Sequence, residues 1–324
     1  MPTHMLRVMC AAMAALCASS PVPAQPPAYP ARPIHLVVFV APGGSADAVA
    51  RLLSEGLGKR LGQPALVENK GGAGGNLASA YVARAQPDGY TLLLTANNHT
   101  VNPALFAHAG YGVQDFAAIA PLMEGPSVIA VPANSRFKTL ADLFREARAA
   151  PGSIAYGSAG AGTPSNIAGE LLQKAAGIRL NHIAYRGSGP SITDAVSGQI
   201  PVVIASLVAA MPQVESGALR ALAVTSKARW PSAPDVPAAA EYGIPAYEHM
   251  TWLGLFAPKA TPQATLDRLN TEVQAVMRQP EVRERVAKLG GTVAFADRRA
   301  YAATIEEDSS TSARLVRELH LKPD

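Results

Sequence analysis

The sequence is poor in residues that carry covalent, redox or metal chemistry. Its two cysteines, Cys10 and Cys17, both lie close to the N-terminus. The remaining chain therefore offers no disulfide and no thiol nucleophile. The histidines are scattered without metal-ligand spacing, and neither a Gly-x-Ser-x-Gly elbow nor a His-Glu-x-x-His pair occurs. We therefore expect no catalytic residues, no metal site and no cofactor.

Charge of one sign and long apolar runs are also scarce. Charged residues make up 16% of the 324 residues, and the formal net charge is +4 without any basic run. This balance argues against a nucleic-acid partner. The apolar run from Val8 to Ala18 is well short of the ~20 residues that a membrane span needs, and no second run reaches that length.

The N-terminal segment matches a secretory signal peptide. Arg7 precedes the apolar run, and small residues follow it up to a cleavage site after Ala24. A lipoprotein is disfavoured because Leu16, not a small residue, stands before Cys17. Cleavage leaves 27 Lys and Arg against 24 Asp and Glu and no cysteine. In an oxidising compartment the core must then stabilise the fold without disulfides.

Short apolar segments alternate with helical patterns along the mature chain. This alternation predicts an α/β fold with largely parallel sheets, whose ligands bind at the carboxyl ends of strands. Extended segments on both sides of Gly125-Pro126, and a second at 250–257, predict two crossings between two lobes. Strands are expected at 34–40, 65–68, 90–95, 119–124, 127–131, 153–156, 181–185, 201–206, 221–225 and 250–257. Helices are expected at 78–85, from Asn102-Pro103, and at 139–150, 167–176, 211–217, 261–277, 281–289 and 299–319.

The strand at 34–40 leads into a glycine turn and a helix. Pro42-Gly43-Gly44 ends the strand, and Ser45 or Asp47 is expected to cap the helix that follows. A glycine turn at a helix N-terminus leaves backbone N–H groups unpaired, which makes it a site for an anion. The alternative is a turn that binds nothing.

Further glycine-rich loops follow other predicted strands. The loop at 157–166 feeds a helix N-terminus, with Thr163 as the expected N-cap and Pro164 at the first helical position. A similar loop lies at 186–190. The cluster at 70–76 lacks the ending of a phosphate-binding loop and the spacing of a dinucleotide fingerprint. It is therefore expected to form a tight turn near the ligand cleft.

These segments, in this order, resemble the substrate-binding proteins of tripartite tricarboxylate transporters, also called the Bug receptor family. The resemblance implies an α/β, two-lobed periplasmic-binding-protein fold of a type II-like kind, with two mixed, largely parallel sheets joined by two extended hinge crossings. The matching segments are 36–38 with 41–47, 67–70 with 72–76, 87–93, 168–171, 185–187, 219–225, 234–237 and 281–285.

The resemblance also implies a domain division and a function. After a signal peptide at 1–24, residues 28–124 and 250–324 would form one lobe and residues 125–249 the other. The implied protein is a monomeric, non-enzymatic receptor in the periplasm. It would close on a small carboxylate and deliver it to integral membrane transporter subunits.

The implied site holds one carboxylate on backbone N–H groups and waters of the first loop. The second loop would face it, and Asn98 would add a polar contact. The expected ligand-binding residues are Gly43, Gly44, Ser45, Ala46, Asp47, Asn98, Ser158, Gly162, Thr163, Ser165 and Ala205.

Two segments depart from the family's pattern. Ala205 stands where members that bind amino acids can carry an aspartate for the ammonium, and a buried ammonium without a carboxylate is costly. We therefore expect a ligand without an amino group. The segment 308–312, Asp-Ser-Ser-Thr-Ser, replaces apolar residues and a tryptophan, which predicts a weakened stretch of the last helix, remote from the pocket.

Other functions stay open at this point. A ligand sensor that reports to a signalling system needs the same pocket, whereas an enzyme on this scaffold would need a nucleophile beside a base. The identity of the ligand is open too, since dicarboxylates, tricarboxylates and aromatic acids all fit.

Overall fold

The computed structural model describes residues 29–319 and 321–322. The expected signal peptide and both cysteines lie outside the described residues. The chain divides after Ala31, and its main unit begins at Arg32. Among the helices of the described residues, none combines the length and the apolar character that crossing a membrane requires.

Three parallel strands form one side of the sheet. β1 (Ile34–Val38) lies between β2 (Ala65–Asn69) and β3 (Thr91–Ala96) and pairs in parallel with both. Because the three strands are parallel, the turns that follow them meet at one edge of the sheet. The connecting helices are α2 (Ser45–Leu61), α3 (Asn76–Ala83) and α4 (Asn98–Leu105), with short 3-10 turns at Ala73–Gly75 and Val113–Asp115.

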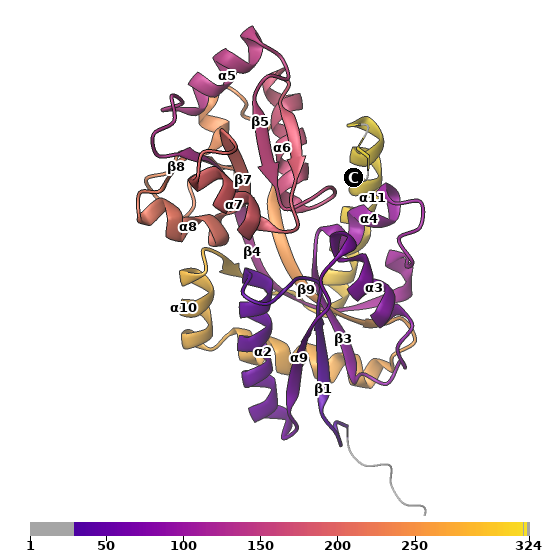
Figure 1. Cartoon of the computed structure of the whole chain (residues 1–324). Coiled ribbons are helices and arrows are strands. Elements are labelled where there is room, and N and C mark those ends of the chain that lie inside the picture. The colour runs from indigo at the N-terminus through magenta and orange to yellow at the C-terminus, as the bar shows by residue number, and fades with distance from the viewer. Residues whose placement is uncertain (1–28, 320, 323–324) are drawn as a thin grey trace, which may run out of the picture. The chain divides into compact units, whose positions relative to one another are not determined.

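Two antiparallel strands cross the middle of the sheet (Figure 1). β4 (Phe116–Pro132) pairs over its first part with β9 (Met250–Pro258), which also pairs with β3. From Ser127 onward β4 pairs with two other strands. The two extended segments expected around Gly125-Pro126 are thus one strand. Pro126 falls where β4 changes partners, a place where a residue without an N–H is tolerated.

The other side of the sheet is again built on parallel strands. β5 (Ala155–Ser158) lies between β6 (Asn181–Ala184) and β7 (Val202–Ser206), while β8 (Leu219–Val224) pairs antiparallel with β4. The intervening elements are α5 (Leu140–Ala149), α6 (Pro164–Ala176), α7 (Ser188–Val196), α8 (Leu207–Glu215) and a 3-10 turn at Ala239–Tyr242. The C-terminal elements are α9 (Gln263–Met277), α10 (Pro280–Lys288), β10 (Thr292–Val293) and α11 (Arg298–Glu318).

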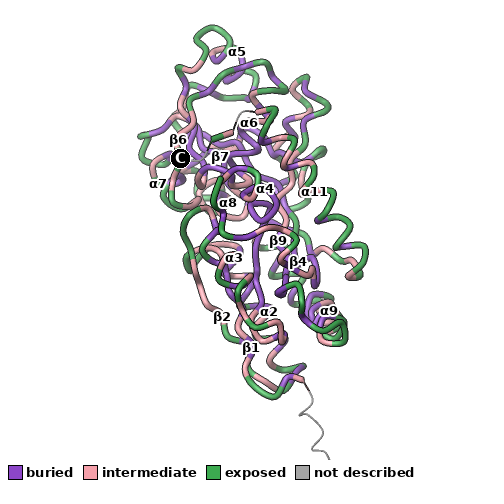
Figure 2. The backbone as a smooth tube through the Cα atoms, turned by 90° about the vertical axis from the view of Figure 1, so that its right-hand side faces the viewer, coloured by how far each residue is buried: buried purple, intermediate pink, exposed green. Residues whose placement is uncertain are grey.

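Within the described residues these strands form one mixed sheet of ten strands. Its order is β2-β1-β3-β9-β4-β7-β5-β6, with β8 and β10 attached to β4. The expected α/β class is confirmed. The sequence predicted two sheets, but β4 joins them because its two parts pair with different neighbours. Buried positions dominate β4 and β9, which place the core along the centre of the sheet (Figure 2).

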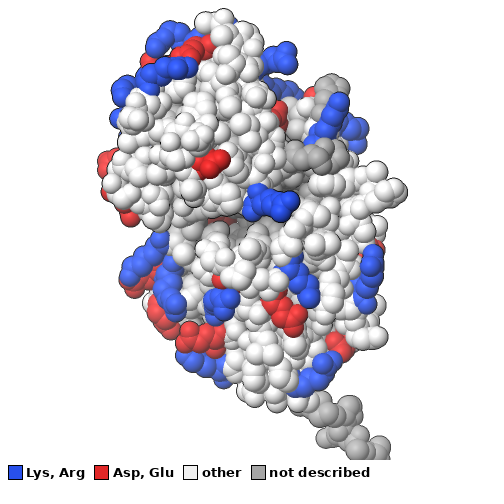
Figure 3. Space-filling model, viewed as in Figure 1, with Lys and Arg blue, Asp and Glu red and all other residues white. Residues whose placement is uncertain are grey.

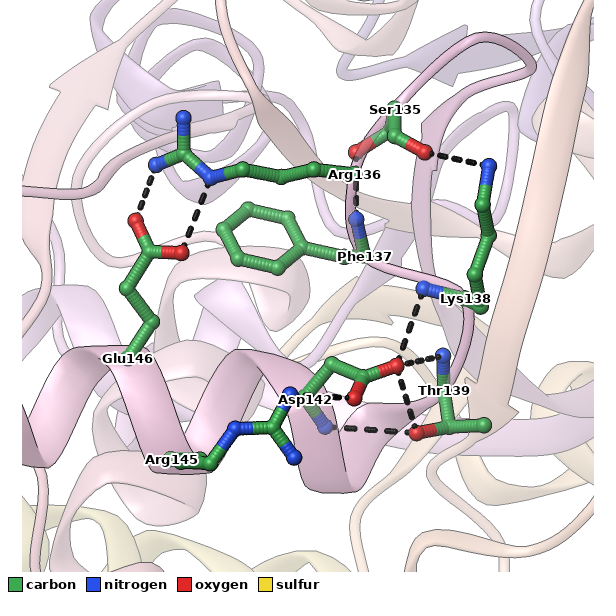
Figure 4. Close-up of polar contacts among 8 residues, drawn as sticks. All are labelled: Ser135, Arg136, Phe137, Lys138, Thr139, Asp142, Arg145 and Glu146. Atoms are coloured by element: carbon green, nitrogen blue, oxygen red, sulfur yellow. Dashed lines mark hydrogen bonds and ion pairs between the residues drawn. The ribbon is translucent and has the colours of Figure 1, made fainter.

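The N-terminus of α5 shows how local sequence sets a helix boundary (Figure 4). Thr139 Oγ1 accepts the N–H of Asp142, and the Asp142 carboxylate accepts the N–H groups of Thr139 and Lys138. The Arg145 guanidinium, which donates to Asp142, and these further hydrogen bonds lower the pKa of Asp142 to about 2. This capping box explains why the helix agrees within one residue with the predicted range.

Helix α4 begins four residues earlier than the sequence predicts. The expected start was Asn102-Pro103, but the helix begins at Asn98 and Pro103 lies inside it. Proline lacks the N–H that would donate to His99 O, and the phenol of Tyr111 donates to that carbonyl instead, at 3.2 Å. The helix therefore tolerates its proline, and Asn98 becomes its first residue.

The last helix is continuous through the polar segment 308–312. Thr100 Oγ1 of α4 donates to Asp308 at 2.5 Å, and Ser312 Oγ donates to Thr100 Oγ1 at 3.3 Å. The helix is not interrupted at the stretch that was predicted to be weakened, and hydrogen bonds to α4 engage its polar side chains. Thr100 is two residues from Asn98, one of the expected ligand-binding residues.

Candidate functional site

The turn after β1 ends in the first N–H groups of α2. Gly44 is the N-cap residue, in an extended conformation, and the first helical hydrogen bond runs from Ala48 N to Gly44 O at 3.0 Å. The amides of Ser45, Ala46 and Asp47 precede that bond, so no helical carbonyl accepts them. The prediction that Ser45 or Asp47 caps the helix is wrong, because Gly44 occupies the cap without a side-chain hydrogen bond.

The carboxylate of Asp47 holds this turn in place. It accepts the N–H of Gly43 (3.0 Å), two bonds from the Arg51 guanidinium (3.0 and 3.1 Å) and one from Asn69 Nδ2 (3.0 Å). Asp47 is only 4% exposed. Burial alone would raise the pKa of Asp47, but the hydrogen bonds from Arg51, Gly43 and Asn69 lower it overall. Asp47 therefore acts as an ionised brace beneath the turn.

The loop after β2 lies directly against this turn. Asn69 Nδ2 also donates to Val40 O at 3.0 Å. Gly71 leaves no room for a side chain, since a Cβ there would lie 3.0 Å from Ala41 N. The tight turn expected at 70–76 is therefore packed beside the first loop.

Two asparagines of α4 converge on the carbonyl of Gly74. Asn98 and Asn102 each donate Nδ2 to this oxygen at 2.9 Å, and Asn102 Nδ2 also donates to Asn76 Oδ1 at 2.7 Å. Both side chains are completely buried, and among the described residues their Oδ1 atoms have no hydrogen-bond partner. Sequence reasoning missed Asn102 because it placed the helix start there. The i, i+4 spacing from Asn98 is the signal that could have found it.

The second loop is shaped by hydrogen bonds within itself. Thr163 is the N-cap of α6 and Pro164 its first residue, as predicted. The Thr163 hydroxyl donates to Gly160 O (2.6 Å) and lies 3.2 Å from Ser165 Oγ. Thr163 therefore holds the N-cap position, but its side chain accepts no N–H of the helix. Ser165 Oγ accepts the N–H of Ala159 at 3.0 Å. These side chains fix the path of the loop rather than extend from it.

A buried network beneath the second loop fixes Asn166. Asn166 Oδ1 accepts the N–H of Gly162 at 3.1 Å, and its Nδ2 donates to the Tyr156 phenol at 3.1 Å. Tyr156 donates in turn to Glu170 at 2.6 Å. Burial, together with the nearby Glu170 carboxylate, raises the pKa of Tyr156 well above its usual value of 10.0. The phenol therefore stays protonated and available to Glu170.

Ser158 at the end of β5 is bonded to a histidine. Its Oγ lies 2.7 Å from His182 Nε2 on the neighbouring strand β6, and Gly160 N donates to the same oxygen at 3.1 Å. Sequence reasoning missed His182, because it asked only whether the histidines have the spacing of metal ligands. It did not ask which residue lies beside each histidine on a neighbouring strand.

The glycine-rich loops at 70–76 and 157–166 meet beside α4. A Cβ at Gly162 would lie 2.9 Å from Asn102 Oδ1, and a Cβ at Gly74 would lie 3.7 Å from Ala161 O. Gly162 also has φ +72°, so glycine is required there by both space and backbone conformation. An apolar cluster joins α4 to α6 and α11 through Val101, Leu105, Ile167 and Val316.

Ala205 occupies a different environment from the other candidates. It lies on β7 opposite Val128 of β4 and packs, completely buried, in an apolar cluster with Leu207. The next residue, Ser206, caps α8 by accepting the N–H of Ala209 at 3.3 Å. The structure thus places Gly162 beside Asn102 of α4, the turn Gly43–Asp47 beside Asn69, and Ala205 in the core.

The polar groups of these loops are mainly amides and hydroxyls. Among the described residues no group of three or more His, Cys, Asp or Glu side chains could hold a metal ion. Basic and acidic side chains are interspersed on the face shown in Figure 3, with wide uncharged areas between them. Two surface hollows, one between α10 and β10 and one between α5 and the end of α6, lie outside these loops. The arrangement is suited to holding an anion by neutral donors.

Comparison with known proteins identifies the family. Residues 49–321 match the family described as tripartite tricarboxylate transporter family receptor, TctC. A UPF0065 protein from the tcbD-tcbE intergenic region of Pseudomonas sp. strain P51 is 39% identical over 265 residues, which cover 81% of this chain and 79% of the relative. BugT of Bordetella pertussis is 32% identical over 323 residues, which cover 99% and 98% of the two chains.

Two solved structures share the fold over most of the chain. Rpa4515 of R. palustris with adipate has a TM-score of 0.86 and 29% identity, and the match covers 91% of this chain and all of Rpa4515. MatC of Rhodopseudomonas palustris with bound malate has a TM-score of 0.81 and 32% identity, over 89% of this chain and all of MatC. The family consists of solute-binding receptors rather than enzymes. The chain belongs to the tripartite tricarboxylate transporter receptor family, TctC, whose members include the Bug proteins.

Proposed function

We propose that this protein captures a small carboxylate in the periplasm and delivers it to a membrane transporter. The observation that carries the proposal is the brace that Asp47 forms beneath the free amides at the start of α2. A helix N-terminus favours an anion by ~0.3–2 kcal/mol per charge, depending on burial. Because Arg51 offsets the charge of Asp47, that carboxylate does not repel the ligand from those amides.

The second loop is proposed to complete the site. It follows β5 as the first loop follows β1, so both lie at the carboxyl ends of parallel strands. The contact between Gly162 and Asn102 supports a position of this loop near α4. Charge-assisted hydrogen bonds contribute roughly 1.5–3 kcal/mol each, so a few of them give about micromolar affinity.

We propose that β4 and β9 serve as hinges between two lobes, 28–124 with 250–324 and 125–249. Pro126, where β4 changes partners, lies opposite Met250, where β9 begins. The chain therefore passes between the proposed lobes at the same level on both crossings, within β4 and at the start of β9. A ligand that contacts both loops would favour the closed state by the free energy of the contacts that exist only there.

The ligand class is proposed from two relatives and from the acidic residue of the first loop. Rpa4515 was solved with adipate and MatC with malate, and both molecules are dicarboxylates without an amino group. Among the expected ligand-binding residues only Asp47 is acidic, and its carboxylate is already engaged by Arg51, Asn69 and Gly43. We therefore propose a carboxylate that lacks an amino group.

The proposed partners are integral membrane transporter subunits. The family's description as a transporter receptor supports this proposal. The expected signal peptide at 1–24 supports a periplasmic location, where such subunits present their outer face.

A thermal-shift screen followed by calorimetry tests this function. The chain without residues 1–24 is mixed with adipate, malate, citrate, benzoate, aspartate and glutamate in turn. A ligand at about 100 times its Kd adds ~2.7 kcal/mol to the free energy of unfolding. We expect at least one dicarboxylate to raise the Tm by several degrees and to bind with about micromolar Kd. Sub-micromolar binding of aspartate or glutamate would contradict the ligand class. Failure of every carboxylate would contradict the function.

A further inference from the structure

The Ser158 hydroxyl lies between a histidine and the second loop. Ser158 is completely buried, and its Oγ is 2.7 Å from His182 Nε2. Gly160 N donates to the same oxygen at 3.1 Å, and Gly160 O lies 3.3 Å away as an acceptor. The hydroxyl is therefore fixed in place, and its single proton has two acceptors within the protein.

The protonation of His182 decides where that proton goes. With Nε2 unprotonated, the Ser158 hydroxyl donates to the imidazole, which is its closer acceptor, and the proton is unavailable to a ligand. In the imidazolium both ring nitrogens are protonated, so Nε2 donates to Ser158 Oγ and the hydroxyl proton turns to another acceptor. The linkage thus takes the neutral ring to carry its single proton on Nδ1. Gly160 O competes weakly for it, because 3.3 Å is long for a hydroxyl donor.

We propose that His182 is a positioning residue that links carboxylate binding to the uptake of a proton. Protonated His182 makes the Ser158 hydroxyl a donor to the bound carboxylate, so the proton and the anion favour each other's binding. The inference rests on the proposed function, because it takes Ser158 to face the ligand. The receptor would hold its ligand more tightly at lower pH and release it more readily at higher pH.

Titratable groups on β5 and α6 lie near His182. The His182 ring lies 4.9 Å from the Tyr156 ring, measured between centroids, and Tyr156 donates to the Glu170 carboxylate at 2.6 Å. Tyr156 stays neutral, and these contacts bring the Glu170 carboxylate to the same side of the strand. Lys174, also on α6, is paired with Glu318 at 2.7 Å.

The opposite face of β6 adds one more titratable pair. Tyr185 donates to Asp194 of α7 at 2.8 Å. Arg179 and Arg186 flank β6 in the chain, so the strand has both acidic and basic neighbours.

Calorimetry with adipate as the probe tests the linkage. The Kd is measured between about pH 6 and about pH 8.5, in two buffers with different ionisation enthalpies. For the unmodified mature chain we expect the Kd to weaken about tenfold as the pH rises across this range. This is the effect of losing one charge-assisted hydrogen bond to the ligand. The heats should also show net proton uptake on binding in the part of the pH range where the Kd changes.

Two variants test whether His182 acts on ligand binding or only on the stability of the fold. His182→Gln supplies an amide donor that does not titrate, so the pH dependence and the proton uptake should both disappear. Ser158→Ala removes the linked hydroxyl, so binding should be weaker and equally independent of pH. His108→Gln, at an exposed histidine, is the matched control and should keep the full pH dependence. The Tm of each variant confirms that it folds.

The outcomes distinguish this inference from the function on which it rests. Adipate binding that is independent of pH in the unmodified chain, or a pH dependence that survives in His182→Gln, would overturn the linkage alone. Failure of adipate and of every other carboxylate to bind would overturn the proposed function, and the linkage with it.

Discussion

Asp47 reaches back across the start of α2 to accept the N–H of Gly43 at 3.0 Å. The helix thereby fixes the turn that precedes it, and the amides between these two residues keep one orientation. Arg51, one helical turn further along, donates two bonds to the same carboxylate and offsets its charge. A loop that is fixed before the ligand arrives loses little entropy on binding.

Replacing Asp47 should weaken the fold in a pH-dependent way. Asp47→Asn removes an ionised acceptor from Arg51 and Asn69, so we expect a loss of about 1–3 kcal/mol in the free energy of unfolding near neutral pH. Because the folded pKa of Asp47 is lowered, its contribution is complete above its usual value of 3.8 and is lost as the pH falls through the folded value. Denaturant unfolding of both proteins should therefore converge in acid. A constant difference across the pH range would show that the charge of Asp47 is not responsible.

A side chain at Gly44 should block the anion site and spare the fold. Gly44 has φ −84°, and the nearest atom to a Cβ there is Val40 Cγ2 at 3.9 Å, so valine fits without backbone strain. Gly44→Val should weaken carboxylate binding at least about tenfold by crowding the amides of α2. Gly58→Val, in the last turn of the same helix, meets only ordinary contacts and is the control. Equal affinity of the two variants by calorimetry would count against the first loop.

Removing the Tyr156 hydroxyl should loosen the second loop. Tyr156→Phe leaves Asn166 Nδ2 and Glu170 without this partner, which we expect to cost about 1–3 kcal/mol in stability and several-fold in affinity. Tyr247→Phe also removes a buried hydroxyl, which donates to Ala168 O at 3.0 Å, but it does not touch the loop. Tyr247→Phe should therefore lower the Tm without changing the Kd. The same loss of affinity in both variants would point to general destabilisation.

Neutralising Asp308 should stabilise the protein near neutral pH. Burial raises the pKa of Asp308, while the Thr100 hydrogen bond partly opposes that effect. The folded state therefore binds the proton more tightly than the unfolded state, and the stability of the protein falls as the pH rises through the folded pKa. Asp308→Asn should gain on the order of 1 kcal/mol at pH ~7.5 and nothing near pH 3.8. Glu307→Gln, at its exposed neighbour, should change stability little at either pH. A loss of stability in Asp308→Asn at neutral pH would mean that the carboxylate is stabilising.

Local signals made the loops and their helices predictable. Proline and glycine after β-branched runs marked the turn before α2, and Thr163-Pro164 marked the start of α6, because turn and cap chemistry depends on adjacent residues. The start of α4 escaped prediction because an internal proline was taken for its first residue. The proline is tolerated because Tyr111 donates to His99 O, and Tyr111 lies 12 positions away in the sequence.

Partners that are distant in sequence were not predictable from a single chain. Asn69 braces Asp47 across 22 positions, His182 contacts Ser158 across 24, and Asn102 reaches Gly74 across 28. These pairs are set by strand order and by the way α4 packs, and no sequence period reports either of them. The joining of the sheet through β4 belongs to the same class, since the change of partners along one strand depends on where β7, β8 and β9 lie.

A crystal structure of the mature chain with its tightest-binding carboxylate tests the central claim most directly. The account predicts that one carboxylate of the ligand accepts hydrogen bonds, directly or through waters, from the amides of Ser45, Ala46 and Asp47, with the 158–166 loop on its other side. A carboxylate held instead by an arginine or lysine side chain, or at a place away from the start of α2, would contradict the account.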